Sequence, residues 1–238
     1  MEKVTPREIR KSKIENRKIS VLTVYDYSFA KILDDAGIDI LLVGDSLGNV
    51  ILGLESTREV TMADMVRHTR AVARGTKRAL VVADMPFGAM KNAVANAKEL
   101  VKAGGEAVKI EGIKEIKGIK GIIKNNIPVM GHLGVLPQTA KEYKLQRSLE
   151  IVEQAKMLEQ AGVFAIVLEL VEPEIAKQVT QAVKIPTIGI YSGPHCDGQV
   201  LVSYDMLGLY PKAPKQAKKY VDLAGEIKKA VKAFISSC

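Results

Sequence analysis

The sequence contains only two cysteines, Cys196 and the C-terminal Cys238. Two cysteines provide no disulfide framework, so we expect a protein of a reducing compartment, the cytoplasm. No apolar run reaches the roughly 18 residues that a membrane span requires, and we expect no membrane partner. The N-terminal stretch MEKVTPREIRKSKIENRK is charged throughout and has no apolar core, so it does not read as a secretory signal.

Aromatic residues are also scarce, at 5%, whereas the formal net charge is +8. The lysines gather in KEIKGIKGIIK and PKAPKQAKKYVDLAGEIKKAVKAF, where they alternate with apolar residues at helical spacing. This pattern is typical of the solvated faces of amphipathic helices, and no aromatic side chains are interleaved on which bases could stack. We therefore expect an acidic small molecule as the partner, and no nucleic acid.

Short apolar runs rich in valine and isoleucine alternate with longer stretches of helical period. The predicted strands are ISVLTVYD, IDILLVGD, RALVVADMP, EAVKIEG, IPVMGHLG, VFAIVLEL, IPTIGIY and a weaker GQVLVSYD. The first intervening helix is predicted to bury a face made of Phe29, Ile32, Leu33 and Ala36. The second is predicted to begin at Thr61 as N-cap, with Asp64 three residues later.

Strands without polar alternation are buried on both faces, and strands separated by helices run parallel. Eight such units in 238 residues predict a closed (β/α)8 barrel, a TIM barrel, with residues 1–238 forming a single domain. The alternative is an open doubly wound sheet. However, YDYSFAK follows the first strand, where that fold would carry a glycine-rich dinucleotide-binding turn.

Acidic residues lie at the ends of the predicted strands, where a barrel would bring them to one rim. The polar residues in such positions are Asp26, Asp45, Asp84, Glu111, His132 and Glu169. Several buried carboxylates repel one another, and a divalent cation or a lysine relieves that cost. Asp45, Asp84 and Glu111 are hard oxygen ligands that suit Mg2+, and Lys109 faces the same way as Glu111 because the two are separated by two residues in a strand.

Two of these residues also have a purely structural interpretation. Asp26 could cap the following helix, and His132 could only hydrogen-bond the backbone of a loop. His68 lies inside a predicted helix and His195 in a loop, and for both we expect a structural or solvated role.

Several motifs together resemble one known family. They are TVYDYSFAKILDDAGIDILLVGDSLG, ADMPF, VKIEG, PVMGHLGVLPQT, VLELV and IPTIGI followed by GPHCDGQVLV. In this order, from about Ile19 to about Lys215, they resemble the ketopantoate (3-methyl-2-oxobutanoate) hydroxymethyltransferases. The resemblance implies a barrel of the phosphoenolpyruvate mutase and isocitrate lyase type, assembled as a homodecamer.

It also implies a reaction. A hydroxymethyl group would pass from 5,10-methylenetetrahydrofolate to 3-methyl-2-oxobutanoate, giving 2-dehydropantoate for pantothenate biosynthesis through a Mg-stabilised enolate. By motif, Asp45, Asp84 and Glu111 match the family's magnesium site. Asp45, Ser46, Asp84 and Lys109 match its ketoacid-binding positions, and Glu169 matches its proton acceptor.

The chain departs from the family pattern in residues 140–148, which are shorter and lack paired glycines, and at Tyr191 and Ser192, where Gly-Ala is usual. We expect these changes to affect the folate side of the pocket. Two alternatives remain open. One is another Mg-dependent 2-oxoacid lyase of the same barrel group, many members of which carry a reactive loop cysteine. The other is a non-catalytic barrel that binds a carboxylate.

Overall fold

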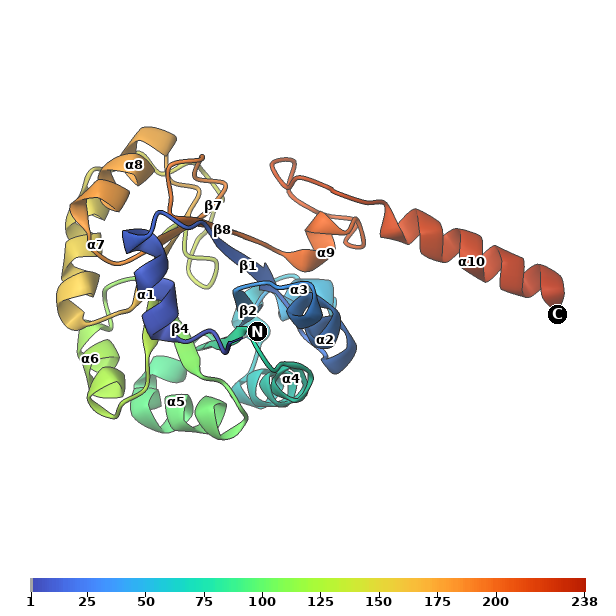
Figure 1. The fold of residues 1–238 in the computed structure, drawn as a ribbon, viewed down its shortest axis with the longest axis horizontal. Helices are drawn as coiled ribbons and strands as arrows, with labels where there is room; N and C mark the ends of the chain where they lie inside the picture. Colours follow the sequence, from blue (N-terminus) through green and yellow to red (C-terminus); the bar gives the residue numbers. More distant parts are fainter. Residues whose placement is uncertain (1) are drawn as a thin grey trace.

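The computed structural model describes residues 2–238 and contains a closed barrel of eight parallel strands (Figure 1). The strands are β1 (Ile19–Thr23), β2 (Ile40–Val43), β3 (Leu80–Asp84), β4 (Ala107–Glu111), β5 (Val129–Gly134), β6 (Ala165–Glu169), β7 (Thr187–Ile190) and β8 (Gly198–Leu201). The ring closes where β1 pairs with β8 in parallel, from Ile19 opposite Gly198 to Leu22 opposite Leu201. An open sheet would leave these two edges unpaired, so the barrel prediction is confirmed.

Helices surround most of the barrel (Figure 1). The longer ones are α1 (Pro6–Ile14), α2 (Tyr27–Asp35), α4 (Met62–Gly75), α5 (Ala93–Lys102), α6 (Ile116–Lys124), α7 (Glu150–Ala161), α8 (Pro173–Ala182) and α10 (Leu223–Ser237). Short turns of helix are α3 (Leu47–Val50), η1 (Thr57–Glu59), η2 (Ala89–Asn92) and α9 (Ser203–Met206). The predicted start of α4 is confirmed, because Thr61 and Asp64 form a reciprocal capping box.

Strands β2, β3 and β7 are buried on both faces along their whole length, which explains their apolar sequences, whereas Ser20 of β1 and Gln199 of β8 are exposed. In β2, Ile40 and Leu42 belong to the cluster that fills the barrel interior. Leu41 and Val43 belong to a second cluster, shared with the helices outside. Alternate residues of a strand point to opposite faces, so a strand with helices on one side and a packed interior on the other needs apolar residues at every position.

The face that α2 buries differs from the prediction. Ile32 is 63% exposed and Ala36 is exposed as well, whereas Ala30, Leu33 and Asp34 are buried. The Asp34 carboxylate accepts hydrogen bonds from the backbone N–H groups of residues 77–79, at 2.6 to 3.1 Å. A carboxylate that accepts hydrogen bonds from the turn before β3 therefore takes the place of an apolar residue on the buried face. A search for apolar periodicity alone does not detect such a residue.

The layer of helices is incomplete beside β7, β8 and β1. Residues 191–197, all of them described, connect β7 to β8 without a helix. The lysine-rich segment after β8 was predicted to be helical throughout, but residues 211–222 form turns and irregular chain, and α10 begins only at Leu223. Figure 1 shows α10 extending away from the barrel, and no described residue of this helix is buried.

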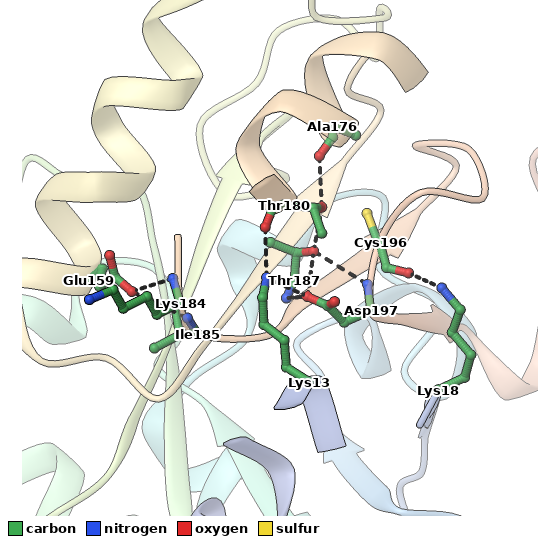
Figure 2. Close-up of polar contacts among 10 residues, drawn as sticks. All are labelled: Lys13, Lys18, Glu159, Ala176, Thr180, Lys184, Ile185, Thr187, Cys196 and Asp197. Atoms are coloured by element: carbon green, nitrogen blue, oxygen red, sulfur yellow. Dashed lines mark hydrogen bonds and ion pairs between the residues drawn. The ribbon is translucent and has the colours of Figure 1, made fainter. Parts of the chain in front are cut away.

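The N-terminal end of the barrel is held by side chains that were not predicted to act together (Figure 2). Asp197 accepts a hydrogen bond from the Thr187 N–H at 2.8 Å and forms an ion pair with Lys13 of α1 at 3.0 Å. Lys18 donates to the Cys196 carbonyl at 2.7 Å. Cys196 is fully buried beside this network. These contacts fasten α1 and the β7–β8 connection across the end of the barrel opposite the strand C-termini.

Candidate active site

The C-terminal ends of the strands surround a cavity of about 430 Å3. All the residues predicted to form the site line this one cavity: Asp45, Ser46, Asp84, Lys109, Glu111 and Glu169. They come from β2, β3, β4 and β6, or directly follow these strands. The barrel therefore brings residues that are far apart in the sequence to one rim, as predicted from their positions at the ends of strands.

Asp26 does not belong to this group. Its carboxylate caps α2 by accepting a hydrogen bond from the Phe29 N–H at 3.0 Å, and it is not among the residues that line the cavity. The structural interpretation of Asp26 is thus the correct one. His68 is structural as well, because its Nδ1 lies 2.6 Å from the Tyr25 carbonyl oxygen.

The centre of the site is an ion pair between neighbouring strands. Lys109 Nζ lies 3.1 Å from Asp84 Oδ1, and both side chains are at least 94% buried. The other oxygen of Asp84 accepts the backbone N–H of Asp45 at 3.0 Å. Burial alone would lower the pKa of Lys109, but the charges of Asp84, Glu111 and Asp45 outweigh it, so the pKa is raised and the ammonium persists.

Gln138 connects two of the acids and was not predicted. Its side-chain amide donates to Asp45 Oδ2 at 2.7 Å and to the Met85 carbonyl at 2.9 Å. Its backbone N–H donates to Glu111 Oε2 at 3.2 Å. The motif PQ after β5 was recognised only as part of the family pattern. In the structure, the glutamine of this motif is a buried amide that orients Asp45.

His132 has a larger role than the loop contact considered for it. It lies in β5, is 2% exposed, and its Nδ1 is 3.1 Å from Lys109 Nζ. An ammonium has no acceptor, so Nδ1 must accept and the ring proton must be on Nε2. Burial and the nearby Lys109 charge lower the pKa of His132 well below its usual value, which keeps the ring neutral. Nε2 lies 3.3 Å from Glu169 Oε2, in contact but without hydrogen-bond alignment.

The acids outnumber the cations in this cavity. Burial raises the pKa of Asp84 and of Glu111 above the ordinary values, and the attraction of Lys109 offsets this only in part. Burial likewise raises the pKa of Glu169 to about 7, again against the attraction of Lys109. Each shift has the same cause, a carboxylate removed from water without enough positive charge nearby.

Ser46 completes the polar wall between β1 and β2. Its hydroxyl lies 2.8 Å from the Tyr25 hydroxyl, which in turn donates to Thr23 Oγ1 at 2.8 Å. Tyr25 is 1% exposed, so the chain of hydroxyls fixes Ser46 from behind. Nothing in the sequence pattern pointed to Tyr25, because an aromatic residue after a strand is usually a core residue.

The donor set fits a hard divalent cation. Among residues 2–238, Glu111 Oε1 has no hydrogen-bond partner, and Asp84 Oδ1 contacts Lys109 without hydrogen-bond alignment. Carboxylate oxygens of this kind are the ligands that Mg2+ prefers. In the same described part of the chain, however, no three acidic, histidine or cysteine side chains already stand in an arrangement that could hold a metal. Gln138 holds Asp45 and Lys109 holds Asp84, so these carboxylates would have to turn.

The two segments that we expected to depart from the family pattern each contribute a tyrosine to the cavity. In residues 140–148, the Gln146 N–H donates to the Leu170 carbonyl at 2.7 Å, and Tyr143 lines the cavity. Ser192 is fully buried, accepts the Val171 N–H at 3.0 Å and donates to the Leu168 carbonyl at 2.7 Å. The serine is thus a structural link between the ends of β6 and β7. Tyr191 lines the cavity instead.

Comparison with known proteins gives a consistent result. Residues 3–238 match the model of the family described as ketopantoate hydroxymethyltransferase. A 3-methyl-2-oxobutanoate hydroxymethyltransferase from Ignicoccus hospitalis is 52% identical over 98% of this chain and 94% of its own length. A protein of the same name from Caldicellulosiruptor saccharolyticus is 53% identical, over 99% and 94%.

Solved structures with much lower identity share the fold. A phosphoenolpyruvate phosphomutase from Streptomyces platensis subsp. rosaceus superimposes with a TM-score of 0.69 at 14% identity, covering 97% of this chain and 86% of that one. A 2,3-dimethylmalate lyase described as a member of the PEP mutase/isocitrate lyase superfamily gives 0.64 at 15%, covering 98% and 86%. A phosphonopyruvate hydrolase in complex with oxalate and Mg++ gives 0.61 at 17%, covering 97% and 84%. The predicted type of barrel is confirmed.

Proposed function

Because the chain belongs to the ketopantoate hydroxymethyltransferase family, we propose that it transfers a hydroxymethyl group from 5,10-methylenetetrahydrofolate to 3-methyl-2-oxobutanoate, giving 2-dehydropantoate. The observation that carries the proposal is the position of Glu169. This carboxylate shares a cavity with the buried Asp84–Lys109 pair, and its pKa of about 7 suits a base at neutral pH.

The 2-oxoacid would bind beside Lys109, whose ammonium attracts the negative charge of the substrate. Ser46 offers a hydroxyl and Asp45 a neighbouring backbone at the same wall of the cavity. Asp84 keeps Lys109 in place and charged. These residues orient the ketoacid so that its C3 carbon, which must lose a proton, faces the β6 side of the cavity.

Glu169 would accept the C3 proton. Its burial makes the carboxylate more basic than in water, and the neutral His132 beside it adds no competing positive charge. The enolate carbon then attacks the methylene carbon of the folate, and the new C–C bond forms as one C–N bond of the methylene bridge breaks. The hydroxyl of a water molecule replaces the second C–N bond, and the proton taken from C3 and the remaining water proton go to the two folate nitrogens. The product carries a hydroxyl oxygen that the methylene donor lacks, so each turnover consumes one water.

Asp45, Asp84 and Glu111 would hold Mg2+, as proposed from their positions in the sequence. A phosphonopyruvate hydrolase of the same fold was solved with oxalate and Mg++, and oxalate, like a 2-oxoacid, carries two adjacent oxygens that can chelate a cation. When bound, the cation would supply Lewis-acid stabilisation of the negative charge on the substrate oxygens. The protein's part is to turn these three carboxylates toward one point.

The proposed reaction is tested by one assay with three omissions. We expect 2-dehydropantoate to form from 3-methyl-2-oxobutanoate and 5,10-methylenetetrahydrofolate in the presence of Mg2+. Omission of either substrate, or of Mg2+ with a chelator added, is expected to abolish it. Product formation that is unaffected by the chelator would contradict the metal assignment, and no product in the complete mixture would contradict the reaction.

The alternative of a lyase with a loop cysteine is not favoured. Cys196 lies near the N-terminal end of the barrel, close to Thr187, and Cys238 ends α10 (Figure 2). Neither of them is among the residues that line the cavity. The non-catalytic alternative would not require a buried carboxylate of raised pKa opposite a lysine.

The chain is also proposed to assemble with copies of itself, as a homodecamer. The support is α10, whose Ile227, Val231, Phe234 and Ile235 are 48 to 68% exposed although they repeat on one face of the helix. An apolar helical stripe of this kind is stable in water when another surface covers it.

We expect light scattering to give a large oligomer for the wild type, and a smaller species for the double variant Val231→Glu/Phe234→Glu. Lys229→Glu changes a charge on the opposite face of α10 and is expected to retain the large species. A wild-type monomer at micromolar concentration would contradict the assembly.

Among residues 2–238, no helix combines the length and the apolar character needed to cross a bilayer.

A further inference from the structure

The cavity has a second polar wall that the assigned residues do not use. The acids, Lys109 and His132 all come from the β2 to β6 side of the rim. On the other side, Tyr191 directly follows β7, and Asp205 lies in α9 after β8. Both residues line the same cavity. The proposed function needs room for two substrates, and the ketoacid occupies the first wall only.

Asp205 is a buried carboxylate with unused hydrogen-bonding capacity. It is 4% exposed, and its Oδ1 has no hydrogen-bond partner among the described residues. Burial raises the pKa of Asp205 to about 6, so it is still largely ionised at neutral pH. A buried acceptor without a donor is costly in a folded protein, so this oxygen requires a donor from an ordered water or from a ligand.

Tyr191 is the second polar residue of this wall. Its hydroxyl also has no partner within residues 2–238, and the charges of Asp205 and Glu169 both reach it, adding to the effect of burial in raising its pKa. Its φ is +54°, a left-handed conformation that glycine adopts freely and a bulky residue does not. A bulky residue in this conformation is strained, and strained positions of this kind cluster at active sites and ligand-binding sites.

The charge along the cavity changes sign from inside to outside. The carboxylate of Asp205 is buried within it, whereas Lys212 of the lysine-rich segment also lines the cavity and is exposed. Tyr210 adds another aromatic ring to the lining on this side. A matching ligand is therefore flat, with N–H donors at its buried end and negative charge at its outer end.

A reduced pterin has this form. Its ring carries an N–H and an amino group side by side, which a single carboxylate can accept together, and the tail of a folate ends in carboxylates. The flat ring can also stack on tyrosine. Building on the proposed function, we propose that Asp205 and Tyr191 bind the amino-pyrimidinone edge of the pterin co-substrate, with its acidic tail directed toward Lys212.

The test is binding of tetrahydrofolate, the product, measured by calorimetry without turnover. Asp205→Asn keeps the size of the side chain and removes its charge, and the loss of a charged hydrogen bond is expected to weaken binding by about 10- to 100-fold. The KM for methylenetetrahydrofolate should rise by the same factor while kcat changes much less. Asp35→Asn, an exposed acid at the end of α2, is the matched control.

Two further variants distinguish binding of the amino-pyrimidinone edge from binding of the acidic tail, and melting temperatures test whether each variant is folded. Tyr191→Phe removes one hydroxyl and is expected to lower the affinity for tetrahydrofolate several-fold. Lys212→Ala should weaken tetrahydrofolate but leave the affinity for tailless 6-methyltetrahydropterin unchanged. Melting temperatures close to that of the wild type establish that each variant is folded.

The proposal is overturned if Asp205→Asn and Tyr191→Phe both bind tetrahydrofolate like the wild type. It is also overturned if Asp205→Asn lowers kcat while affinity and KM stay unchanged, because Asp205 would then act on a proton and not on recognition. Exchange of the ketoacid C3 proton needs no folate, so it reports on the proposed function separately. A wild type that fails this exchange but binds tetrahydrofolate through Asp205 contradicts the function and supports the subsite.

Discussion

Glu169→Gln is expected to reduce turnover by about 100-fold or more while leaving the binding of 3-methyl-2-oxobutanoate near normal, because general-base catalysis contributes a factor of this size. Glutamine keeps the shape of the side chain but takes up no proton. The measurement is exchange of the C3 proton of the ketoacid into deuterated water, followed by NMR with Mg2+ and without folate. This half-reaction isolates the step in which Glu169 acts.

Glu172→Gln is the control, since Glu172 lies three residues further along, is 40% exposed at its side chain and does not line the cavity. We expect it to exchange at the wild-type rate. If Glu169→Gln also exchanges at that rate, Glu169 is not the base, whatever the overall activity.

The same exchange should depend on pH in a defined direction. Only ionised Glu169 accepts a proton, and burial raises its pKa to about 7. The rate should therefore fall as the pH drops below about 7 and level off above it, instead of near 4.5 as for an exposed glutamate. In Glu169→Gln this inflection should disappear. A wild-type profile that is flat from pH 5 to 8 would contradict the assignment.

Asp84→Asn is expected to lower the affinity for Mg2+ by at least about 10- to 100-fold. Even the removal of a group that only orients a metal ligand causes a loss of this size. Asparagine is preferable to alanine here. Either change removes the negative charge that pairs with Lys109, and breaking a buried ion pair destabilises a protein by about 3–5 kcal/mol. Asparagine, however, keeps an oxygen that can accept a hydrogen bond from the ammonium and leaves no cavity. Titration calorimetry with Mg2+, with and without 3-methyl-2-oxobutanoate, measures the effect.

A matched control exists at the end of β1. Asp26 also follows a strand, but it caps α2 and does not line the cavity. Asparagine is as good an N-cap as aspartate, so Asp26→Asn should change neither stability nor affinity for Mg2+. Wild-type affinity for Mg2+ in Asp84→Asn would show that this carboxylate is not a ligand.

The sequence predicted the residues that depend on strand geometry. Lys109 and Glu111 line one cavity because residues two apart in a strand point the same way, and Asp45, Asp84 and Glu169 join them because parallel strands end together. His132 and Gln138 were underestimated because their roles depend on neighbours from other strands. Neither a histidine within a strand nor an amide in a loop gives any sign of which buried group it will contact.

The errors in the fold have the same origin. Periodicity predicted Ile32 as buried, yet the turn before β3 needs the carboxylate of Asp34, two residues later. The lysine spacing after β8 resembled a helix from residue 211, but two prolines, Pro211 and Pro214, lie in that segment, which is irregular as far as Leu223. Proline lacks a backbone N–H donor, and its ring disfavours the helical conformation of the residue before it.

The pairing of β1 with β8, which closes the barrel, has a consequence for the synthesis of the polypeptide chain. β1 is made first among the strands, but its second neighbour, β8, begins only at Gly198. At about 5–20 residues per second, the roughly 180 intervening residues take on the order of 10–40 s to be synthesised. During that time the nascent sheet has an open edge at β1 and another at its growing end. A chain released before β8 keeps both edges, and unpaired edges are templates for aggregation. Protection of truncated chains, by chaperones or by rapid proteolysis, is therefore a requirement that this topology places on the cell.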